Sequence, residues 1–178
     1  MYLQRALAKT LREAQTAFTA VLLTGPRQSG KTTLLRHEYG DQSDYLSFDD
    51  PLETEFARSD PVGFLNRFRD RPAILDEIQY VPDILPHLKL RIDAQPGLTG
   101  RWLLTGSQQF ELMQGVSESL AGRVAILDLY PFSAAERSPG SLAEAVWLGG
   151  YPVPALYPER RDLWTRSYIR TYLERDVR

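Results

Sequence analysis

The sequence predicts an α/β fold in which helices cover both faces of a parallel sheet. Short apolar segments alternate with segments of helical periodicity as far as Pro131, and this alternation is typical of βαβ units. A glycine-rich segment, Gly25–Thr32, stands between the first apolar segment and the helix that follows it. Because the alternation stops at Pro131, we expect a core over residues 1–132 and a small helical segment over residues 133–178.

Five apolar segments are the predicted strands. The first of them, Ala20–Thr24, is almost wholly apolar, as strands buried on both faces of a parallel sheet are. The other four are Asp44–Phe48, Ala73–Leu75, Arg101–Thr105 and Arg123–Leu129. Polar pairs follow three of these strands, namely Asp49-Asp50, Asp76-Glu77 and Gly106-Ser107.

Helices are predicted between the strands and before the first of them. Leu3, Leu7, Leu11 and Ala14 recur at helical spacing within Met1–Gln15. Asp60-Pro61 has the N-cap and first-turn residues of a helix that continues to about Arg69. The remaining helices of the core are Lys31–Tyr39 and Asp83–Ala94.

The final segment is predicted to be helical throughout. Ser133 and Glu136 form a capping box, and Ser141–Leu148 is a further helix before the turn at Gly149–Pro152. From Glu159 to Arg178, one face of a last helix gathers Leu163, Trp164, Tyr168, Tyr172 and Leu173. Since no stop signal closes that helix, we expect the chain to be cut off before a further domain.

Composition excludes several classes of protein. The 178 residues include no cysteine, which excludes disulfide frameworks and thiol nucleophiles, and the net charge of −2 argues against a broadly basic nucleic-acid binder. Uncharged segments are too short to span a membrane, so a cytoplasmic protein without a membrane partner is expected. Six arginines after Pro158 leave DNA binding open, although four acidic residues lie among them.

The segment Gly25–Thr32, GPRQSGKT, matches the pattern G-x-x-x-x-G-K-[ST] and is called the phosphate loop below. Its glycines let successive backbone N–H groups face a bound anion, and the next helix adds its positive N-terminus. Lys31 is expected to reach the β- and γ-phosphates, and the Thr32 hydroxyl to coordinate Mg²⁺. The alternative, a turn with an exposed lysine, is disfavoured by the flanking strand and helix. Phosphate contacts are expected from Gly25, Pro26, Arg27, Gln28, Ser29, Gly30, Lys31, Thr32 and Thr33.

Asp76 and Glu77 end the third strand, 45 residues after Lys31. In P-loop NTPases an aspartate in this place holds Mg²⁺, and an adjacent glutamate can act as the general base that activates water. We therefore expect Asp76 to bind the metal and Glu77 to drive hydrolysis. On their own, two acidic residues at a strand end are more often merely solvated.

Two further positions are weaker candidates. Ser107, after the fourth strand, can sense the γ-phosphate or orient water, with Thr105 and Gln108 as the next choices; an ordinary turn explains it equally well. Arg123, next to Gly122 and before the fifth strand, can act as an arginine finger on a neighbouring subunit. The alternative for Arg123 is a surface ion pair of little energetic weight.

Taken together, GPRQSGKTTL, ILDEIQ, LLTGSQQF, SLAGRVAILDLYPFS, GGYP and YIRTYLERDV resemble a family of prokaryotic AAA-type P-loop ATPases, close to the archaeal and origin-recognition-like ATPases. The resemblance implies a P-loop NTPase three-layer sandwich whose five-stranded parallel sheet has the order 5-1-4-3-2. It also implies ATP and Mg²⁺ as ligands of Gly30, Lys31, Thr32 and Asp76, with Glu77 as base and Ser107 as sensor. Members usually continue into a C-terminal domain of unknown function, of which residues 151–178 would be the beginning.

The leading hypothesis is an ATPase that couples Mg²⁺-dependent ATP hydrolysis to an unknown protein or nucleic-acid partner, with Arg123 acting in trans in a homo-oligomer. One alternative is a nucleotide-binding interaction module with little turnover. A second is a small-molecule kinase, which is weaker because no arginine-rich lid follows the fourth strand. A GTPase is weaker still, since the chain has no N-K-x-D sequence.

Overall fold

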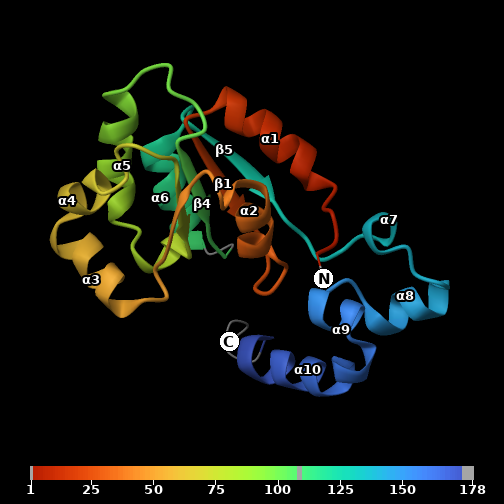
Figure 1. The fold of residues 1–178 in the computed structure, drawn as a ribbon. Coiled ribbons are helices and arrows are strands. Elements are labelled where there is room, and N and C mark those ends of the chain that lie inside the picture. Colours follow the sequence, from red (N-terminus) through yellow and green to blue (C-terminus); the bar gives the residue numbers. More distant parts are fainter. Residues whose placement is uncertain (1, 108–109, 174–178) are drawn as a thin grey trace.

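Five parallel strands form the centre of the molecule, which a computed structural model describes over residues 2–107 and 110–173 (Figure 1). The strands are β1 (Ala20–Thr24), β2 (Asp44–Ser47), β3 (Ala73–Asp76), β4 (Trp102–Thr105) and β5 (Val124–Asp128). Their order in the sheet, β2-β3-β4-β1-β5, confirms the expected order counted from the other edge. All carboxyl ends therefore meet at one edge of the sheet, which we call the carboxyl edge.

The sheet is the middle of three layers, because successive residues of its strands face opposite sides. Leu22 packs into one hydrophobic cluster while Val21 and Leu23 pack into a second. The first face is covered by α3 (Pro51–Ser59), α4 (Pro61–Asn66), α5 (Ile84–Asp93) and α6 (Phe110–Leu120), and the second by α1 (Leu7–Ala17) and α2 (Lys31–Tyr39) (Figure 1). The α/β sandwich expected from the alternation is confirmed.

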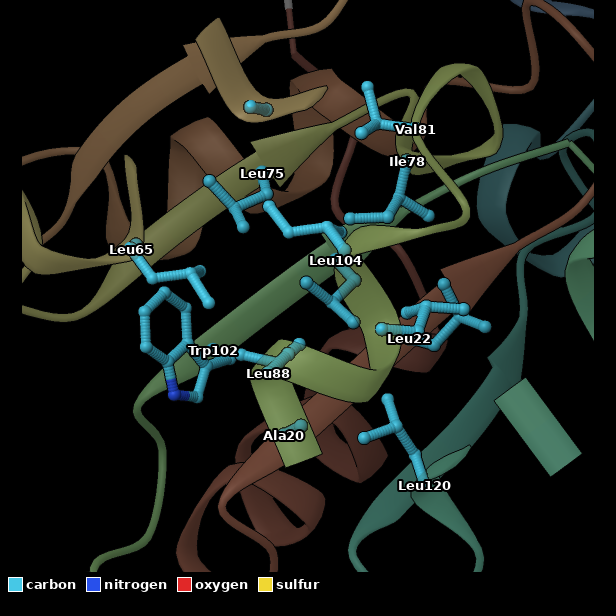
Figure 2. Close-up of a cluster of buried hydrophobic side chains, with 14 of the residues drawn as sticks. Ala20, Leu22, Leu65, Leu75, Ile78, Val81, Leu88, Trp102, Leu104 and Leu120 are labelled. Carbon is cyan, nitrogen blue, oxygen red and sulfur yellow. The ribbon is translucent and has the colours of Figure 1, made fainter. Parts of the chain in front are cut away.

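The larger cluster lies between the sheet and the helices α3 to α6. Figure 2 shows Trp102 of β4 beside Leu65 of α4 and Leu88 of α5, and all three side chains are buried. The Trp102 ring also meets Phe68 edge to face, with centroids 6.2 Å apart. Each large apolar side chain buried in this way contributes about 1.5–3 kcal/mol. The strand ends at the carboxyl edge are thus held by a packed and rigid support.

Four helices of the core differ from the sequence prediction: α3 and α6 were not predicted, α4 ends at Asn66 instead of about Arg69, and α1 begins later than expected. The helix expected over Met1–Gln15 begins only at Leu7, because the preceding residues carry Arg5 into a buried position. Helix α3 was not predicted at all. Asp50, expected only as one of a polar pair after the second strand, accepts a hydrogen bond from the backbone N–H of Leu52, and Pro51 occupies the first turn. This is the standard N-cap arrangement of a helix.

The final segment consists of short helices beside the core. They are α7 (Ala134–Arg137), α8 (Leu142–Leu148), α9 (Pro152–Leu156), η2 (Pro158–Arg160), α10 (Arg161–Tyr168) and η3 (Ile169–Leu173) (Figure 1). The capping box of Ser133 and Glu136 is present. The single helix predicted from Glu159 is wrong, since a 3₁₀ turn precedes α10 and π-type geometry follows it. Leu163 does not share the aromatic face, because it is 76% exposed.

Within the described residues, no helix has the length and apolar character needed to cross a lipid bilayer.

Candidate functional site

The phosphate loop connects β1 to α2 and depends on backbone angles that favour glycine. Gly25 has φ of +137° and Gly30 has φ of +97°. A Cβ atom at Gly25 would lie only 2.2 Å from the carbonyl oxygen of Leu129, so no side chain fits there. Gln28 also has a positive φ, of 62°, which costs about 1–3 kcal/mol for a residue other than glycine. The loop is therefore held in a shape that its own local preferences do not favour.

The Lys31 side chain folds back across the inside of this loop. Its Nζ donates hydrogen bonds to the carbonyl oxygens of Gly25 and Pro26, each at 3.0 Å. Burial lowers the pKa of Lys31, and the charges of Glu77 and Asp76 act in the opposite direction. An anion entering the loop would relieve the desolvation of this ammonium group.

The carboxylate of Asp76 accepts hydrogen bonds from three hydroxyl groups. Thr32 Oγ1, at the start of α2, lies 2.9 Å from both carboxylate oxygens. Tyr45, from β2, donates its phenolic hydrogen to Oδ2 at 2.9 Å, and Thr105 at the end of β4 donates to Oδ1. Burial and the bond to Asp76 raise the pKa of Tyr45 to about 12. Three neighbouring elements thus converge on one buried carboxylate.

Glu77 follows Asp76 with left-handed backbone angles, φ 59° and ψ 48°. Its backbone N–H donates to Thr105 Oγ1 at 3.0 Å, and its carboxylate accepts a hydrogen bond from the side-chain amide of Gln79. The amide oxygen of Gln79 in turn accepts from the backbone N–H of Ser107 at 3.3 Å. The ends of β3 and β4 are therefore linked through Gln79, and Glu77 and Ser107 lie on either side of it.

Ser107 itself is buried, and its hydroxyl has no hydrogen-bond partner among the described residues. Two atoms of the phosphate loop, Ser29 Oγ and Arg27 Nε, are also buried without a hydrogen-bond partner among the described residues. Gln108, the third choice for a sensor, lies outside the described residues. Unpartnered buried polar atoms are costly unless a ligand or water completes them, and these three belong to the loop and to the neighbouring strand end.

Arg123 lies at the opposite edge of the sheet, where β5 begins. It forms a two-pronged ion pair with Asp93 at the end of α5, with Nε–Oδ1 at 2.5 Å and Nη2–Oδ2 at 3.0 Å. The hydrogen bond from Arg123 holds the pKa of Asp93 below its usual range. The structure brings Lys31, Thr32, Asp76, Glu77 and Ser107 to one edge, and it does not bring Arg123 to them.

The final segment contacts the phosphate loop directly, which no sequence motif indicated. Trp164 of α10 donates its indole N–H to Gln28 Oε1 at 2.8 Å. Tyr168 donates its hydroxyl to the carbonyl oxygen of Arg27 at 3.3 Å and stacks on the Trp164 ring at a centroid distance of 4.7 Å. Tyr151 Oη lies 3.1 Å from Tyr168 Oη. These contacts place an aromatic group from the final segment against the loop.

Two adjoining pockets open beside the loop. The first, of about 230 Å³, is lined by Gln28, Gly30, Lys31, Thr32, Thr33, Glu77 and Pro152. The second, of about 190 Å³, is mostly apolar and aromatic and is lined by Tyr2, Leu3, Arg5, Ser29, Gly30, Thr33, Phe132, Pro152, Leu156 and Tyr157. The two pockets share Gly30, Thr33 and Pro152 as lining residues, so they lie next to each other, and the first is the more polar of the two.

A protein family described as an AAA domain matches residues 17–138, which include the loop, both acidic residues and all five strands. The chain belongs to the AAA domain family. This AAA domain is 37% identical over 178 residues to the uncharacterised protein Rv2008c of Mycobacterium tuberculosis and, equally, to the uncharacterised protein Mb2031c of Mycobacterium bovis. Each match covers 98% of this chain and 40% of the relative, so the chain spans about two fifths of the length of these relatives.

Among solved structures, the AAA domain resembles the crystal structure of a DNA replication initiation factor, with a TM-score of 0.48 and 14% sequence identity. That match covers 74% of this chain and 46% of the other.

The oxygen ligands at the carboxyl edge fit a magnesium ion bound together with a nucleotide. Among the described residues no group of three or more His, Cys, Asp or Glu side chains could hold a metal by itself. Mg²⁺ is usually bound by one or two carboxylates together with substrate phosphates and water. The Thr32 hydroxyl and the Asp76 carboxylate, side by side at the loop, supply that small protein share.

Proposed function

We propose that this AAA domain binds ATP with Mg²⁺ and hydrolyses it, coupling the nucleotide state to a protein or nucleic-acid partner. Membership of an ATPase-type, nucleotide-binding family supports this proposal. The observation that carries it is the direct hydrogen bonding of Thr32, from the phosphate loop, to both oxygens of Asp76, from β3. A phosphate site and a metal carboxylate in contact are what a P-loop ATPase needs.

The two neighbouring pockets beside the loop support ATP as the ligand. The polar pocket, which contains Lys31 and Thr32, suits the phosphates. The apolar pocket is lined by Tyr2, Phe132 and Tyr157, whose rings suit a planar base. The proposed arrangement places the phosphates against the helix N-terminus and the base between the start of the chain and α9.

The mechanism assigns one task to each group at the carboxyl edge. Lys31 would exchange its two loop carbonyl oxygens for oxygens of the β- and γ-phosphates, and the loop N–H groups would hold the remaining phosphate charge. Thr32 and Asp76 would hold Mg²⁺. The ion, when bound, neutralises charge on the β- and γ-phosphate oxygens. Ser107 would orient the attacking water through its unpartnered hydroxyl.

Glu77 would accept the proton that the water loses. The water oxygen forms a bond to the γ-phosphorus while the bond from that phosphorus to the β–γ bridging oxygen breaks. The bridging oxygen leaves on ADP with the electron pair, and inorganic phosphate is released. The Gln79 amide occupies Oε2 of Glu77, so the proton would go to Oε1 unless Gln79 gives way to water.

This same contact favours the second candidate, a nucleotide-binding module with little turnover. While the Gln79 amide stays on Oε2, one of the two oxygens of the Glu77 carboxylate is engaged by the protein rather than by water. The two functions differ in the rate of hydrolysis and agree in the binding of ATP.

Steady-state release of ADP distinguishes the two. We expect the wild-type chain to turn over ATP and Glu77→Gln to bind ATP with wild-type affinity while hydrolysing it about 10²–10⁴-fold more slowly, as is usual when a general base is lost. The matched control is Glu118→Gln, an exposed glutamate on α6. If Glu77→Gln and wild type release ADP at the same rate, Glu77 is not the base and the binding module is the better description.

The proposal includes the assembly of several copies of this chain into a homo-oligomer. Arg123 would act on the nucleotide of a neighbouring subunit in a homo-oligomer, which requires that its ion pair with Asp93 opens or that the neighbour docks beside it.

A further inference from the structure

Arg27, the third residue of the phosphate loop, carries a positive charge that nothing in the described part of the chain neutralises. Among the described residues, no carboxylate forms an ion pair with Arg27, and no acceptor takes a hydrogen bond from its Nε. Its Nε is nevertheless buried and so is removed from water as well. A buried donor without a partner is costly unless a ligand or water completes it. Such a cost in a loop shaped for anions points to an absent anionic partner.

The other arginines in buried or functional positions are paired. Arg5 forms an ion pair with Glu136 at 3.0 Å, and Arg123 forms one with Asp93. Within the described residues, Arg27 differs from these arginines because it has no ion-pair partner.

Arg27 lies close to Lys31 in the phosphate loop. The Lys31 ammonium rests on the carbonyl oxygens of Gly25 and Pro26, the two residues that precede Arg27. The charge of Arg27 acts on Lys31 and helps to lower its pKa, after the larger effect of burial. Glu77 acts on Lys31 as well. Arg27 and Glu77 thus both lie near the Lys31 ammonium, where the terminal phosphate of ATP would have to lie.

The final segment holds Arg27 from outside the loop. The ring of Tyr172 lies 5.9 Å from the guanidinium carbon, and Tyr168 hydrogen-bonds the Arg27 carbonyl oxygen. An aromatic ring near a guanidinium group limits its rotation without neutralising its charge. The Tyr172 contact therefore leaves the charge of Arg27 unneutralised.

We propose that Arg27 binds the γ-phosphate of the ATP held in its own loop. The proposal rests on the proposed function and assigns Arg27, one of the expected phosphate contacts, to the γ-phosphate in particular. A guanidinium group can give two parallel N–H bonds to phosphate oxygens, whereas a lysine offers a point charge. Arg27 therefore distinguishes ATP from ADP and stabilises the charge that develops on the γ-phosphate oxygens during transfer. It does so in cis, independently of any neighbouring subunit.

Binding of a non-hydrolysable ATP analogue and of ADP, each with Mg²⁺, tests this by calorimetry on the 178-residue chain. For Arg27→Gln we expect analogue affinity to fall about tenfold or more and ADP affinity to change less than about twofold. Arg27→Lys should recover part of the loss. Arg166→Gln is the matched control, because it removes an exposed arginine of α10 and should leave both affinities unchanged.

Equal losses for the analogue and for ADP would overturn the proposal, because Arg27 would then support the loop as a whole. Unchanged affinity for both would overturn it too. Thermal unfolding of each variant separates a loss of contact from a loss of fold, and Arg27→Lys retains the charge if Arg27→Gln proves unstable. A wild-type chain that binds neither nucleotide would instead refute the proposed function itself.

Discussion

The Asp76 carboxylate receives hydroxyl hydrogens from Thr32, Tyr45 and Thr105, which come from α2, β2 and β4. A carboxylate accepts such bonds without supplying a proton of its own. In Asp76→Asn, one carboxylate oxygen is replaced by an NH₂ group, which cannot accept hydrogen bonds from these hydroxyl groups. The negative charge of Asp76 is thus required for the local geometry as well as for the proposed metal site.

Lys31 is the residue whose removal bears most directly on phosphate binding. Lys31→Ala deletes a charge-assisted contact worth about 1.5–3 kcal/mol, so we expect the affinity for ATP with Mg²⁺ to fall about tenfold or more in calorimetry. Lys89→Ala, on α5, is the matched control and should not alter affinity. If Lys31→Ala bound ATP as well as wild type, the phosphate-loop assignment would have to be abandoned.

At the scale of elements, residues before α1 connect three parts of the molecule. Arg5 is 5% exposed and donates to Glu136 of α7, to the Ser29 carbonyl oxygen of the phosphate loop and to the Tyr130 carbonyl oxygen after β5. Burial alone would raise the pKa of Glu136, but hydrogen bonds from the backbone of Ser133 and Ala6 and from Arg5 outweigh burial and lower it. Hydrogen bonds from the protein thus take the place of water around the Arg5–Glu136 ion pair.

Arg5→Ala should therefore destabilise the fold strongly. It leaves Glu136 buried without its cation, and breaking a buried pair typically costs about 3–5 kcal/mol. We expect the midpoint of urea unfolding to fall accordingly. Arg12→Ala on α1 is the control, because its pair with Glu38 is half exposed at the arginine and should cost less than about 1 kcal/mol. Equal midpoints for the two variants would show that Arg5 has no special structural role.

Most elements of the core could be predicted because their signals are local. The apolar segment Ala20–Thr24 and the helix Lys31–Tyr39 have the predicted bounds. Three of the other strands differ by one residue at one end, and β5 differs by one residue at each end. The start of α1 could not be predicted, because its periodicity includes Leu3 while the tertiary contacts of Arg5 hold that part of the chain outside the helix. The cap at Asp50 was visible in the sequence and was misinterpreted.

The residues of the candidate site also fall into those that local motifs predict and those that only the tertiary structure brings together. Lys31, Thr32, Asp76 and Glu77 belong to compact motifs, so the sequence predicts that they meet. Tyr45 reaches Asp76 only because β2 pairs with β3, and a strand order is needed to see this. The contact of α10 with the loop joins residues 136 positions apart, Gln28 and Trp164, and no spacing rule covers it.

At the scale of the whole molecule, the two edges of the sheet carry different groups. The carboxyl edge bears the phosphate loop and the acidic residues. The amino edge bears Arg123, which pairs with Asp93. A finger at the amino edge can serve only a nucleotide bound by another subunit, so the Arg123 proposal depends on self-assembly.

Arg123→Ala should accordingly leave the ATP affinity of a single subunit intact and remove any ATPase activity that rises with protein concentration. A finger supplied in trans can contribute about 10³–10⁵ in rate. Mixing Arg123→Ala with Lys31→Ala subunits should restore part of the activity, because each keeps the part that the other lacks. If specific activity is independent of concentration and the mixture shows no rescue, Arg123 is a surface residue.

The contact between α10 and the phosphate loop also has a spectroscopic consequence. The chain has three tryptophans. Trp102 is enclosed in the core, whereas Trp147 is 61% exposed and lies under the Arg161 guanidinium. Trp164 alone touches the phosphate loop, through Gln28. Its indole emission is sensitive to the polarity and hydrogen bonding around it, so the chain contains an intrinsic optical reporter of the loop. With Trp147 replaced by phenylalanine, the remaining emission would come from Trp102 and Trp164. The surroundings of Trp102 in the core do not change with the loop, so a change in emission would report on Trp164.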